Sequence, residues 1–405
     1  MDCRFCGAEL TDEFVDLGAS PLANSYLTPQ QASTGEPFYP LRAMVCRACL
    51  LVQLDAYESA AHIFSDYAYF SSYSTSWLEH ARRYVQMAVE RFGLGAGSQV
   101  VELASNDGYL LQYFGEHGVP VLGIEPAANV ARVAIERGIP TEVAFFGADT
   151  ARAFAPDRAA DLLLGNNVLA HVPDLNDFVS GMRILLKAGG VITMEFPHLM
   201  RLVEENQFDT IYHEHFSYFS FLTVRRVFEA HRLRIFDVEE LPTHGGSLRI
   251  FGCHAAAAHA QTGAASSLAE REREAGYDAI DLYLTYAERV RAAKHEFLEF
   301  LIALKRDGKR IAGYGAPAKG NTLLNFCGVR TDFIDFTVDR NPHKQGLMLP
   351  GTHIPILAPE ALAERRPDVV LILPWNLHEE IVEQLAYIRD WGGQFAVRAP
   401  VPRLF

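Results

Sequence analysis

The stretch from residue 99 to residue 125 constrains the fold of this chain more than any other, because it has the pattern of a strand, a tight turn, a helix and a second strand. An apolar run at 99–103 leads into a turn of small and polar residues at 104–108, and the apolar residues within 110–114 then recur at helical spacing. A second apolar run ends at Glu125. Such a βαβ unit predicts an α/β protein with a parallel sheet.

The turn of this unit is a candidate cofactor cradle. Small residues let backbone N–H groups approach a ligand, and an acid at the end of the second strand can accept hydrogen bonds from two ribose hydroxyls. Two of the three glycine positions of the dinucleotide fingerprint hold other residues here, and an acid precedes the turn, which favours S-adenosylmethionine (SAM) over NAD. A Rossmann-like turn without a cofactor is the alternative. The residues expected to bind the cofactor here are Glu102, Ala104, Ser105, Asn106, Gly108 and Glu125.

Strand and helix patterns go on alternating up to residue 196, which predicts a doubly wound parallel sheet. Ligands bind such sheets at the carboxyl ends of the strands. Phe145 and Phe146 end one predicted strand and are therefore expected to sandwich a flat base. Asn166 and Asn167 follow another strand and are expected to hydrogen-bond near the amino-acid end of the cofactor. The predicted helices are 128–137, 149–154 and 175–185, and the predicted strands are 141–145, 161–165 and 190–196.

Four of the six cysteines form two CxxC pairs, Cys3 with Cys6 and Cys46 with Cys49. Four thiolates at this spacing predict a tetrahedral zinc site rather than a disulfide framework, with reduced, unligated thiols as the alternative. A site closed by four sulfur ligands has no open position, so the zinc would hold the fold and not catalyse. The sequence between the pairs contains four prolines and no helical pattern, which predicts a small β-rich lobe.

The composition limits the partners of the chain. Its 405 residues suggest two or three domains, and its net charge of −14 argues against a nucleic-acid surface, which needs Lys and Arg to neutralise phosphates. No apolar run approaches the roughly 20 residues of a membrane helix, and residues 1–7 contain no signal-peptide core. We therefore expect a cytoplasmic protein that binds neither nucleic acid nor membrane. The oligomeric state stays open, and a monomer is compatible with the sequence.

Two clusters carry candidate catalytic groups. Residues 65–73, ahead of a helix predicted at 75–92, are dense in tyrosines that can roof a pocket or pack in a seam between domains. Residues 208–216, FDTIYHEHF, hold the densest group of ionisable side chains. A histidine oriented by a neighbouring Glu, with a Tyr hydroxyl beside it, suits general-base work near neutral pH. Metal ligation is an alternative that lacks the HExxH spacing, and a polar cluster capping the sheet edge is another.

Two glycine-containing turns further along suit an oxygen-rich ligand. The segment HGGSLR at 244–249 places a His and an Arg on either side of two glycines, an arrangement that a plain hairpin explains equally well. After two connecting helices predicted within 262–306, a second α/β domain begins, and its turn at 315–320 carries Lys319. A turn of this kind at a helix N-terminus can hold a pyrophosphate. Asp339 at the end of a later strand keeps NAD binding as an alternative, beside an unliganded scaffold. The predicted elements of this domain are strands 309–314, 332–339 and 369–374 and helix 321–326.

Taken in order, seven motifs resemble those of the nucleotide-sugar C-methyltransferases that act on 4-keto deoxysugars, and they extend over essentially the whole chain. The resemblance implies a zinc lobe at 1–64, a class I methyltransferase domain with a Rossmann-like fold at 65–255, and connecting helices with a C-terminal Rossmann-like domain for the sugar nucleotide at 256–405. The motifs are CxxC…CxxC, DYAYFSSYS, VVELASNDG, FDTIYHEHF, HGGSLR, GYGAPAKGNTLLNFCG and PGTHIPI.

The resemblance also assigns catalytic roles. The last His of the family's YHEH motif is the proposed base, so this role falls on His215, with Tyr212 and Glu214 as its neighbours and Tyr67 as the active-site tyrosine. The chain departs from the family at Ala104, where Gly is frequent, and at position 213, where His replaces a common acid. These departures leave the SAM interpretation intact and the exact substrate open.

The expected reaction is SAM-dependent methylation at C3 of a nucleotide-linked 4-keto-6-deoxy sugar. Removing a proton next to a ketone needs a base and a hydrogen-bond donor for the enolate oxygen, and a His with a Tyr hydroxyl supplies both. The alternatives are a sugar O- or N-methyltransferase, an NAD-dependent sugar-nucleotide oxidoreductase and a non-catalytic zinc scaffold. The residues expected to contact the substrate are Tyr69, Tyr73, His244, Gly245, Gly246, Arg249, Lys319, Asn325, Lys344 and His353.

Overall fold

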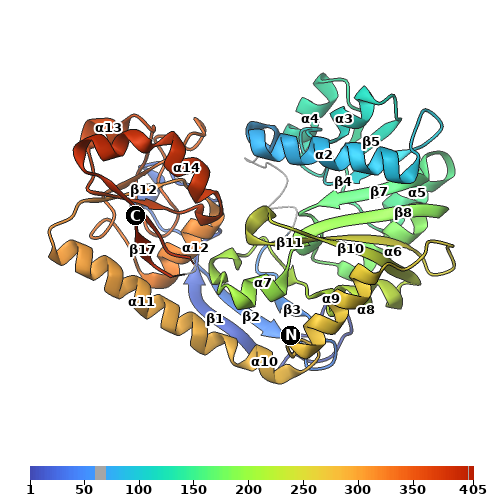
Figure 1. Cartoon of the computed structure of the whole chain (residues 1–405), viewed down its shortest axis with the longest axis horizontal. Helices are drawn as coiled ribbons and strands as arrows, with labels where there is room; N and C mark the ends of the chain where they lie inside the picture. The colour runs from blue at the N-terminus through green and yellow to red at the C-terminus, as the bar shows by residue number, and fades with distance from the viewer. Residues whose placement is uncertain (60–69, 400) are drawn as a thin grey trace.

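The structure, a computed structural model, describes residues 1–59, 70–399 and 401–405. Its strands form three sheets, in the central, N-terminal and C-terminal parts of the chain (Figure 1). No helix among these described residues is both long and apolar enough to span a bilayer.

The central sheet has seven strands in the order β10-β11-β8-β7-β4-β5-β6. The strands from β6 to β8 are parallel, and β11 lies antiparallel between β8 and β10. Its strands are β4 (Val100–Leu103), β5 (Val121–Ile124), β6 (Thr141–Glu142), β7 (Ala160–Asn166), β8 (Leu186–Pro197), β10 (Leu233–Leu241) and β11 (Ser247–His254).

Both faces of this sheet are buried, because neighbouring side chains of one strand enter different cores. Val101 packs in a core that includes Phe178 and Met182 of α6, whereas Val100 packs with residues of α2 and α3 such as Tyr84. The prediction of a doubly wound sheet is therefore confirmed. The helices of this part are α2 (Thr75–Phe92), α3 (Leu111–Glu116), α4 (Ala128–Glu136), α5 (Ala148–Arg158), α6 (Leu175–Leu185), α7 (Leu199–Glu204) and α8 (Phe221–Ala230).

Local signals at the helix ends explain why some bounds follow from the sequence. The side chain of Ser74 accepts a hydrogen bond from the backbone N–H of Trp77 at the start of α2, and Gly93 ends the helix with a φ of 62°. Asp174 caps α6 in the same way by accepting from the N–H of Asp177 at 3.0 Å. The helices predicted at 75–92 and 175–185 have these bounds in the structure.

Several predicted elements differ from the structure in their bounds; the strand predicted at 332–339, for example, is only Phe336–Val338. The strand expected at 141–145 has only two residues, because the chain leaves the sheet edge after Glu142 and exposes Val143 and Phe145. The connection expected to form two helices forms three, since Gly276, at a φ of 89°, interrupts the helical path after the first. These helices are α9 (Gly263–Glu274), α10 (Ile280–Leu284) and α11 (Tyr286–Arg306).

The N-terminal lobe is a small antiparallel sheet in the order β1-β2-β3-β9. Its first three strands, β1 (Asp12–Ser20), β2 (Tyr39–Val45) and β3 (Val52–Leu54), come from the first 54 residues, but β9 (Ser217–Tyr218) comes from far along the chain. Val52 pairs with Tyr218 and Gln53 with Ser217. The lobe therefore holds the end of the FDTIYHEHF segment by backbone pairing.

The C-terminal sheet has the order β14-β13-β12-β15-β16-β17, parallel except for its last strand. Together with its helices this is the expected Rossmann-like arrangement, with helix α12 following the central strand β12. The elements are β12 (Ile311–Tyr314), β13 (Phe336–Val338), β14 (Ile356–Leu357), β15 (Val369–Ile372), β16 (Gln394–Val397), β17 (Arg403–Leu404), α12 (Ala318–Cys327), α13 (Ala361–Arg365) and α14 (His378–Gln384).

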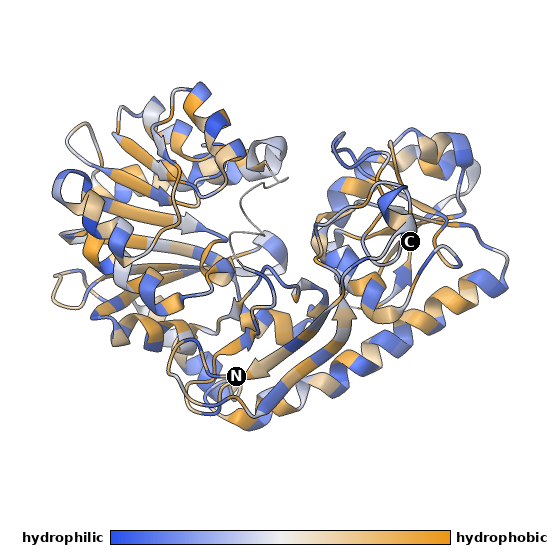
Figure 2. Ribbon diagram, turned by 180° about the vertical axis from the view of Figure 1, so that it is seen from behind, coloured by the Kyte–Doolittle hydropathy of each residue, from blue (hydrophilic) through white to orange (hydrophobic). Residues whose placement is uncertain are grey.

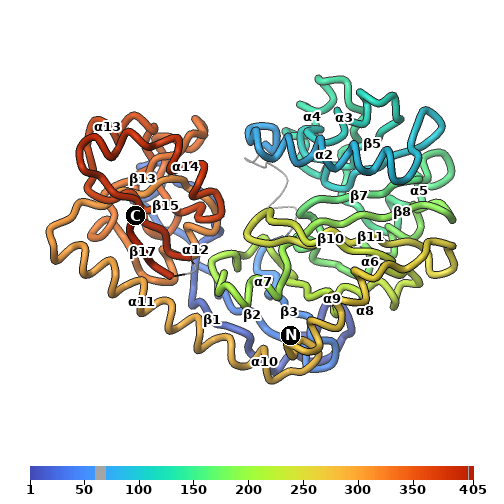
Figure 3. The backbone as a smooth tube through the Cα atoms, in the orientation of Figure 1, coloured from blue at the N-terminus to red at the C-terminus, as the bar shows by residue number. Residues whose placement is uncertain are grey.

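Strand β1 and helix α11 join the central and C-terminal parts along one edge of the molecule (Figures 1 and 3). Phe14 of β1 stacks on Tyr286 of α11 with ring centroids 4.5 Å apart. Seen from behind, apolar residues fill the strands of both large sheets, while α11 shows a polar side to solvent (Figure 2). The amino end of the chain lies in the lobe, and the carboxyl end lies in the C-terminal part (Figure 3).

Candidate active site

A cavity of about 430 Å³ lies where the three parts of the chain meet. Its wall takes side chains from the carboxyl edge of the central sheet, from the loop after β1 and from the start of α12. A volume of this size is typical of a site for a small organic ligand. We therefore compare the site residues predicted from the sequence with the residues that line this cavity.

The turn after β4 forms one end of the cavity. Ala104 and Asn106 line it and adopt positive φ angles of 54° and 51°. Glu125 also lines it, and its two carboxylate oxygens accept hydrogen bonds from the N–H groups of Asn106 at 2.9 Å and Ala127 at 2.8 Å. Burial raises the pKa of Glu125. This carboxylate therefore fixes the shape of the turn as well as facing the cavity.

Three other residues expected at the cradle, one in β4 and two in the turn, do not line the cavity. Ser105 and Glu102 are buried, and neither carboxylate oxygen of Glu102 has a hydrogen-bond partner among the described residues. Burial raises the pKa of Glu102 well above its usual range. Gly108 has a φ of 76°, and a Cβ there would lie 2.3 Å from Cδ1 of Ile139. These three residues shape the cradle. The expectation that all six residues contact the cofactor directly is therefore not supported for Glu102, Ser105 and Gly108.

The side chains expected to contact the flat base and the amino-acid end of the cofactor do line the cavity. Phe145, Phe146, Asn166 and Asn167 all line the cavity. The side-chain oxygen of Asn167 is buried without a hydrogen-bond partner among the described residues. Aromatic rings, an unpaired amide oxygen and a strand-end carboxylate fit a ligand that joins a nucleoside to an amino acid.

His215 also lines the cavity, and a hydrogen bond fixes its tautomer. Its Nδ1 is 3.1 Å from the carbonyl oxygen of Thr210. A carbonyl can only accept, so Nδ1 carries the proton and Nε2 carries the lone pair. Burial lowers the pKa of His215 well below its usual range, and the nearby His171 lowers it further. The ring is therefore neutral at pH 7, with Nε2 able to accept a proton.

The neighbours of His215 differ in part from those expected. The ring of Tyr212 lies 4.1 Å and that of His171 4.6 Å from its own. Glu214 lines the cavity, but its Oε1 accepts from Nδ2 of Asn24 at 2.6 Å. The Thr210 carbonyl orients the His215 ring.

The remaining His of the FDTIYHEHF segment points away from the cavity. Nε2 of His213 is 3.2 Å from the carbonyl oxygen of Pro40, and its ring packs edge-on against Tyr39 and Tyr57. Burial lowers its pKa. His213 therefore belongs to the contact between the segment and the N-terminal lobe.

The HGGSLR segment contributes only its histidine to the cavity. His244 lines the wall with a φ of 56°, its ring lies 5.2 Å from that of Trp77, and burial lowers its pKa to about 4. Gly245 packs against Trp375, where a Cβ would lie 2.4 Å from the indole, and Gly246 packs against Arg201. Neither glycine reaches the cavity.

Arg249 is a correction to the sequence-based expectation. Its guanidinium is buried, 2.7 Å from Oε2 of Glu195 and 3.0 Å from a carboxylate oxygen of Glu239, over the ring of Tyr84. The antiparallel register of β11 on β8 places Arg249 opposite Glu195. The positive charge of Arg249 is paired with Glu195 and Glu239, so it is not available to a substrate.

Three more expected substrate contacts lie elsewhere. Tyr73 is 68% exposed and outside the cavity wall. Nδ2 of Asn325 donates to the carbonyl oxygens of Asn321 and Pro350, and His353 pairs with Glu36 at 3.0 Å. Asn325 and His353 therefore join segments of the fold. Tyr69, also an expected substrate contact, and Tyr67, the expected active-site tyrosine, lie outside the described residues.

Two lysines of the C-terminal part line the cavity, Lys319 in the segment 315–320 and Lys344 in the loop after β13. The expected phosphate cradle is partly filled by the protein itself, because the N–H of Ala316 donates to Oδ2 of Asp339 at 2.7 Å. The other oxygen of Asp339 accepts from the N–H of Asn341 at 2.8 Å. Asp339 does not line the cavity, whereas Glu125 does, so Asp339 is not presented there as a ribose ligand for NAD.

Sequence reasoning missed several cavity residues, among them His171, Trp77, Asn24 and Tyr26. His171 follows β7 and could have been found by the rule for strand ends, and Trp77 begins α2. Asn24 and Tyr26 reach the cavity from the loop after β1. That loop is placed by long-range pairing, since Leu27 bridges to Met348, and no local pattern signals it.

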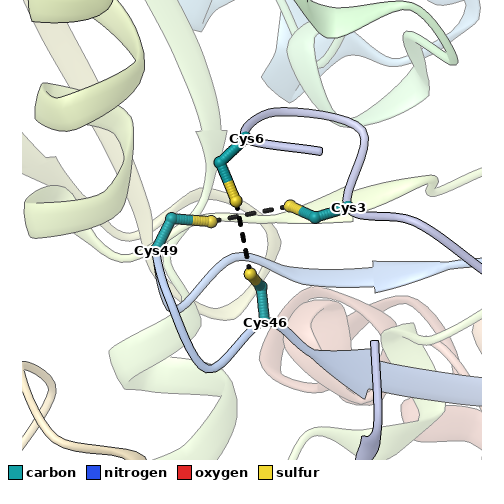
Figure 4. Close-up of side chains that lie close together, drawn as sticks. All are labelled: Cys3, Cys6, Cys46 and Cys49. Carbon is teal, nitrogen blue, oxygen red and sulfur yellow. Dashed lines mark hydrogen bonds between the residues drawn. The ribbon is translucent and has the colours of Figure 1, made fainter. Parts of the chain in front are cut away.

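The four predicted zinc ligands converge in the N-terminal lobe (Figure 4). Their sulfur atoms lie within 4.8 Å of one another, with Cys3 and Cys49 3.6 Å apart and Cys6 and Cys46 3.5 Å apart. Zn–S bonds of about 2.3 Å in a tetrahedron separate the sulfurs by roughly 3.8 Å. Nε2 of the buried Gln53 lies 3.2 Å from Sγ of Cys3, as a supporting hydrogen bond would. The cluster fits a structural zinc site.

Comparison with known proteins agrees with this architecture. Three family models match: "Putative zinc binding domain" over residues 3–64, "Methyltransferase domain" over 77–237 and "C-methyltransferase C-terminal domain" over 242–402. The chain is thus an enzyme of the SAM-dependent methyltransferase class, with a class I methyltransferase fold, SAM as its methyl donor and a zinc-binding lobe.

The family follows from a full-length relative. The C-methyltransferase NovU of Streptomyces niveus is 40% identical over 407 residues, which cover 100% of this chain and 96% of NovU. The chain belongs to this C-methyltransferase family. An uncharacterized methyltransferase of Mycobacterium leprae is 28% identical over 100 residues, 25% of this chain and 37% of its own. The magnesium protoporphyrin IX methyltransferase of Synechocystis, solved with bound SAM, is 13% identical with a TM-score of 0.34, covering 44% of this chain and 77% of that chain.

Proposed function

We propose that this C-methyltransferase acts at C3 of a nucleotide-linked 4-keto-6-deoxy sugar and that His215 is its base. One observation carries the proposal: the bond from Nδ1 of His215 to the Thr210 carbonyl leaves the lone pair on Nε2, in the cavity that also holds the SAM turn. A neutral imidazole is a competent base for a proton next to a ketone. The motif series that the chain shares with sugar C-methyltransferases supports the choice of a keto sugar.

The cavity can place the two reactants in separate regions. Asn106, Glu125, Asn166 and Asn167, with Phe145 and Phe146, would hold SAM at the edge of the central sheet, and SAM supplies the methyl group when bound. The rest of the wall comes from the lobe, from the C-terminal part and from loops of the central part, and it would hold the sugar nucleotide. Much of the rate enhancement would come from this joint positioning. The substrate side of the wall consists of Asn24, Tyr26, His171, Tyr212, Glu214, His215, His244, Lys319 and Lys344.

The residues then perform one proton transfer. Nε2 of His215 takes the proton from C3, the C–H electron pair becomes part of a C=C bond, and the carbonyl π electrons move to the ketone oxygen. That oxygen needs a hydrogen-bond donor as its charge develops. The nucleophilic carbon is thus generated beside the methyl donor, and His215 later releases its proton to solvent.

The test is to follow the methyl group. Incubation with ¹³C-methyl SAM and 4-keto-6-deoxy nucleotide sugars, with C3 bearing either an amine or a hydroxyl, should give a product one methylene heavier with the label on carbon. Carbon NMR distinguishes this from a label on oxygen or nitrogen. Methylation on a heteroatom, or no methylation of any keto sugar nucleotide, would contradict the proposal.

We also propose that the three domains of the chain are residues 1–64, 65–255 and 256–405.

A further inference from the structure

Lys319 is a half-buried cation that the protein does not pair with a carboxylate. Its Nζ donates to Oδ1 of Asn376 at 2.7 Å and lies 4.5 Å from the ring centroid of Trp375. Among the residues that the structure describes, no carboxylate lies within the 4.0 Å of an ion pair with it. An ammonium has three N–H donors, and Asn376 is a neutral partner for one of them. A partly desolvated charge with one neutral partner is placed to bind an acceptor from outside the protein.

The second lysine of the cavity is in a different position. Nζ of Lys344 donates to the carbonyl oxygen of Ala316 at 2.8 Å, lies 3.8 Å from Oδ2 of Asp339 and sits over the ring of Tyr26. Lys344 is thus already paired with a carboxylate. Of the two cavity lysines, Lys319 is the one whose charge is available to a ligand.

The position of Lys319 relates it to the base. It lies in the first turn of α12 and lines the same cavity as His215 and His244, and its charge lowers the pKa of both imidazoles. Burial lowers the pKa of Lys319 itself to about 8, while Asp209 raises it and Arg398 lowers it. Near pH 7 the site therefore holds a neutral base and a charged donor together.

The turn that carries Lys319 is a poor place for a pyrophosphate. The N–H of Ala316, which would have faced a phosphate, donates to Asp339, whose carboxylate lies at the turn. A phosphate there would meet a negative charge and lose one backbone donor. The geometry of the turn therefore does not favour the role expected from the sequence, in which Lys319 offsets the charge of a pyrophosphate.

We propose that Lys319 is a catalytic residue whose ammonium binds the ketone oxygen of the sugar and stabilises the negative charge that develops there. This inference rests on the proposed function. When Nε2 of His215 removes the proton from C3, the π electrons of the carbonyl move to the oxygen, and Lys319 keeps its proton and donates hydrogen bonds to the oxyanion. When C3 receives the methyl group, those electrons return to the carbonyl, so Lys319 ends unchanged.

The experiment isolates proton removal from methyl transfer. The full-length zinc-loaded enzyme is incubated in D₂O with a 4-keto-6-deoxy nucleotide sugar and S-adenosylhomocysteine, and exchange of the C3 proton is followed by NMR. Lys319→Gln is expected to slow both exchange and kcat by roughly 10² to 10³-fold, as for loss of an oxyanion donor, with a small change in KM. Lys305→Gln, outside the cavity, is the control for the loss of one positive charge and should exchange at the wild-type rate.

The pH profile gives a second readout. Wild-type kcat should fall as pH rises through about 8, where Lys319 loses its proton. Lys319→Arg keeps the charge at high pH, so this fall should move upward by more than one pH unit. If Lys319→Gln does not bind SAM, we conclude that it has not folded. The pH profile of Lys319→Arg then decides the inference.

Different failures are distinguishable. An Lys319→Gln enzyme that exchanges at the wild-type rate when saturated, but has a raised KM, would overturn the catalytic role and return Lys319 to substrate binding. An alkaline fall in kcat that is unchanged in Lys319→Arg would overturn it as well. A wild-type enzyme that neither exchanges nor methylates any keto sugar nucleotide would overturn the proposed function, and the role of Lys319 with it.

Discussion

The neutral histidines of the cavity predict how the stability of the protein depends on pH. His171 and His244 have pKa values lowered to about 4 by burial, and the pKa of His215 is also lowered well below its usual range. In the unfolded chain a histidine has a pKa of about 6.5. Between these limits the unfolded state binds protons that the folded state does not, so stability is full above pH 6.5 and is lost as pH falls.

The size of the effect follows from the number of groups. Each neutral histidine removes about 1.4 kcal/mol of stability per pH unit once the pH is well below 6.5, because one proton is taken up on unfolding. Three such groups together give a slope of roughly 4 kcal/mol per pH unit between pH 5.5 and pH 4.5, before other groups add to it. The free energy of unfolding, measured by urea titration with tryptophan fluorescence, should fall with about this steepness.

The decisive variant is His215→Asn, which removes one titrating group and keeps a polar side chain. Its stability curve should be flatter than that of the wild type by about 1.4 kcal/mol per pH unit over the same interval. His254→Asn, on β11 and away from the cavity, is the matched control. If His215→Asn has the same slope as the wild type, then His215 is protonated in the folded protein, and the argument that it is a neutral base fails.

Three further predictions follow from the site and the lobe. His215→Asn should retain SAM binding by calorimetry but lower kcat by roughly 10² to 10⁴-fold, the usual loss for a general base; near-normal turnover would assign proton removal to another group. Glu125→Ala should weaken SAM binding by about 1.5 to 3 kcal/mol for each charge-assisted bond lost, and unchanged affinity in a folded variant would argue against this cradle. Elemental analysis should find about one zinc per chain, and Cys46→Ser should lose the metal and lower the melting temperature; a chain without stoichiometric zinc would contradict the four-sulfur site.

The parts of the fold that could be predicted are those governed by local rules. Helices α2 and α6 have amphipathic patterns and capping residues, and the bounds expected for them are those observed. Strand β6 could not be delimited from an apolar run, because its length depends on where the chain leaves the sheet edge. The break after α9 required a glycine whose left-handed conformation is visible only in three dimensions.

The site could be predicted where its functional side chains lie close together in the sequence. His215, Tyr212 and Glu214 share one short segment and lie at one cavity, as expected. Arg249 looked like a ligand-binding residue because its partner Glu195 is distant in sequence and is brought opposite to it only by strand register. Asn24 was missed for the same reason, since its partner Glu214 lies 190 positions away.

The pairing of β3 with β9 has a consequence for the synthesis of the protein. Leu54 and Ser217 bound a stretch that a ribosome, adding about 5 to 20 residues per second, needs roughly 10 to 30 s to translate. During this interval the outer edge of β3 presents unpaired backbone donors and acceptors, the kind of edge on which nascent chains aggregate. His215 lies two positions before β9, so the strand that covers this edge is synthesised immediately after the histidine of the cavity.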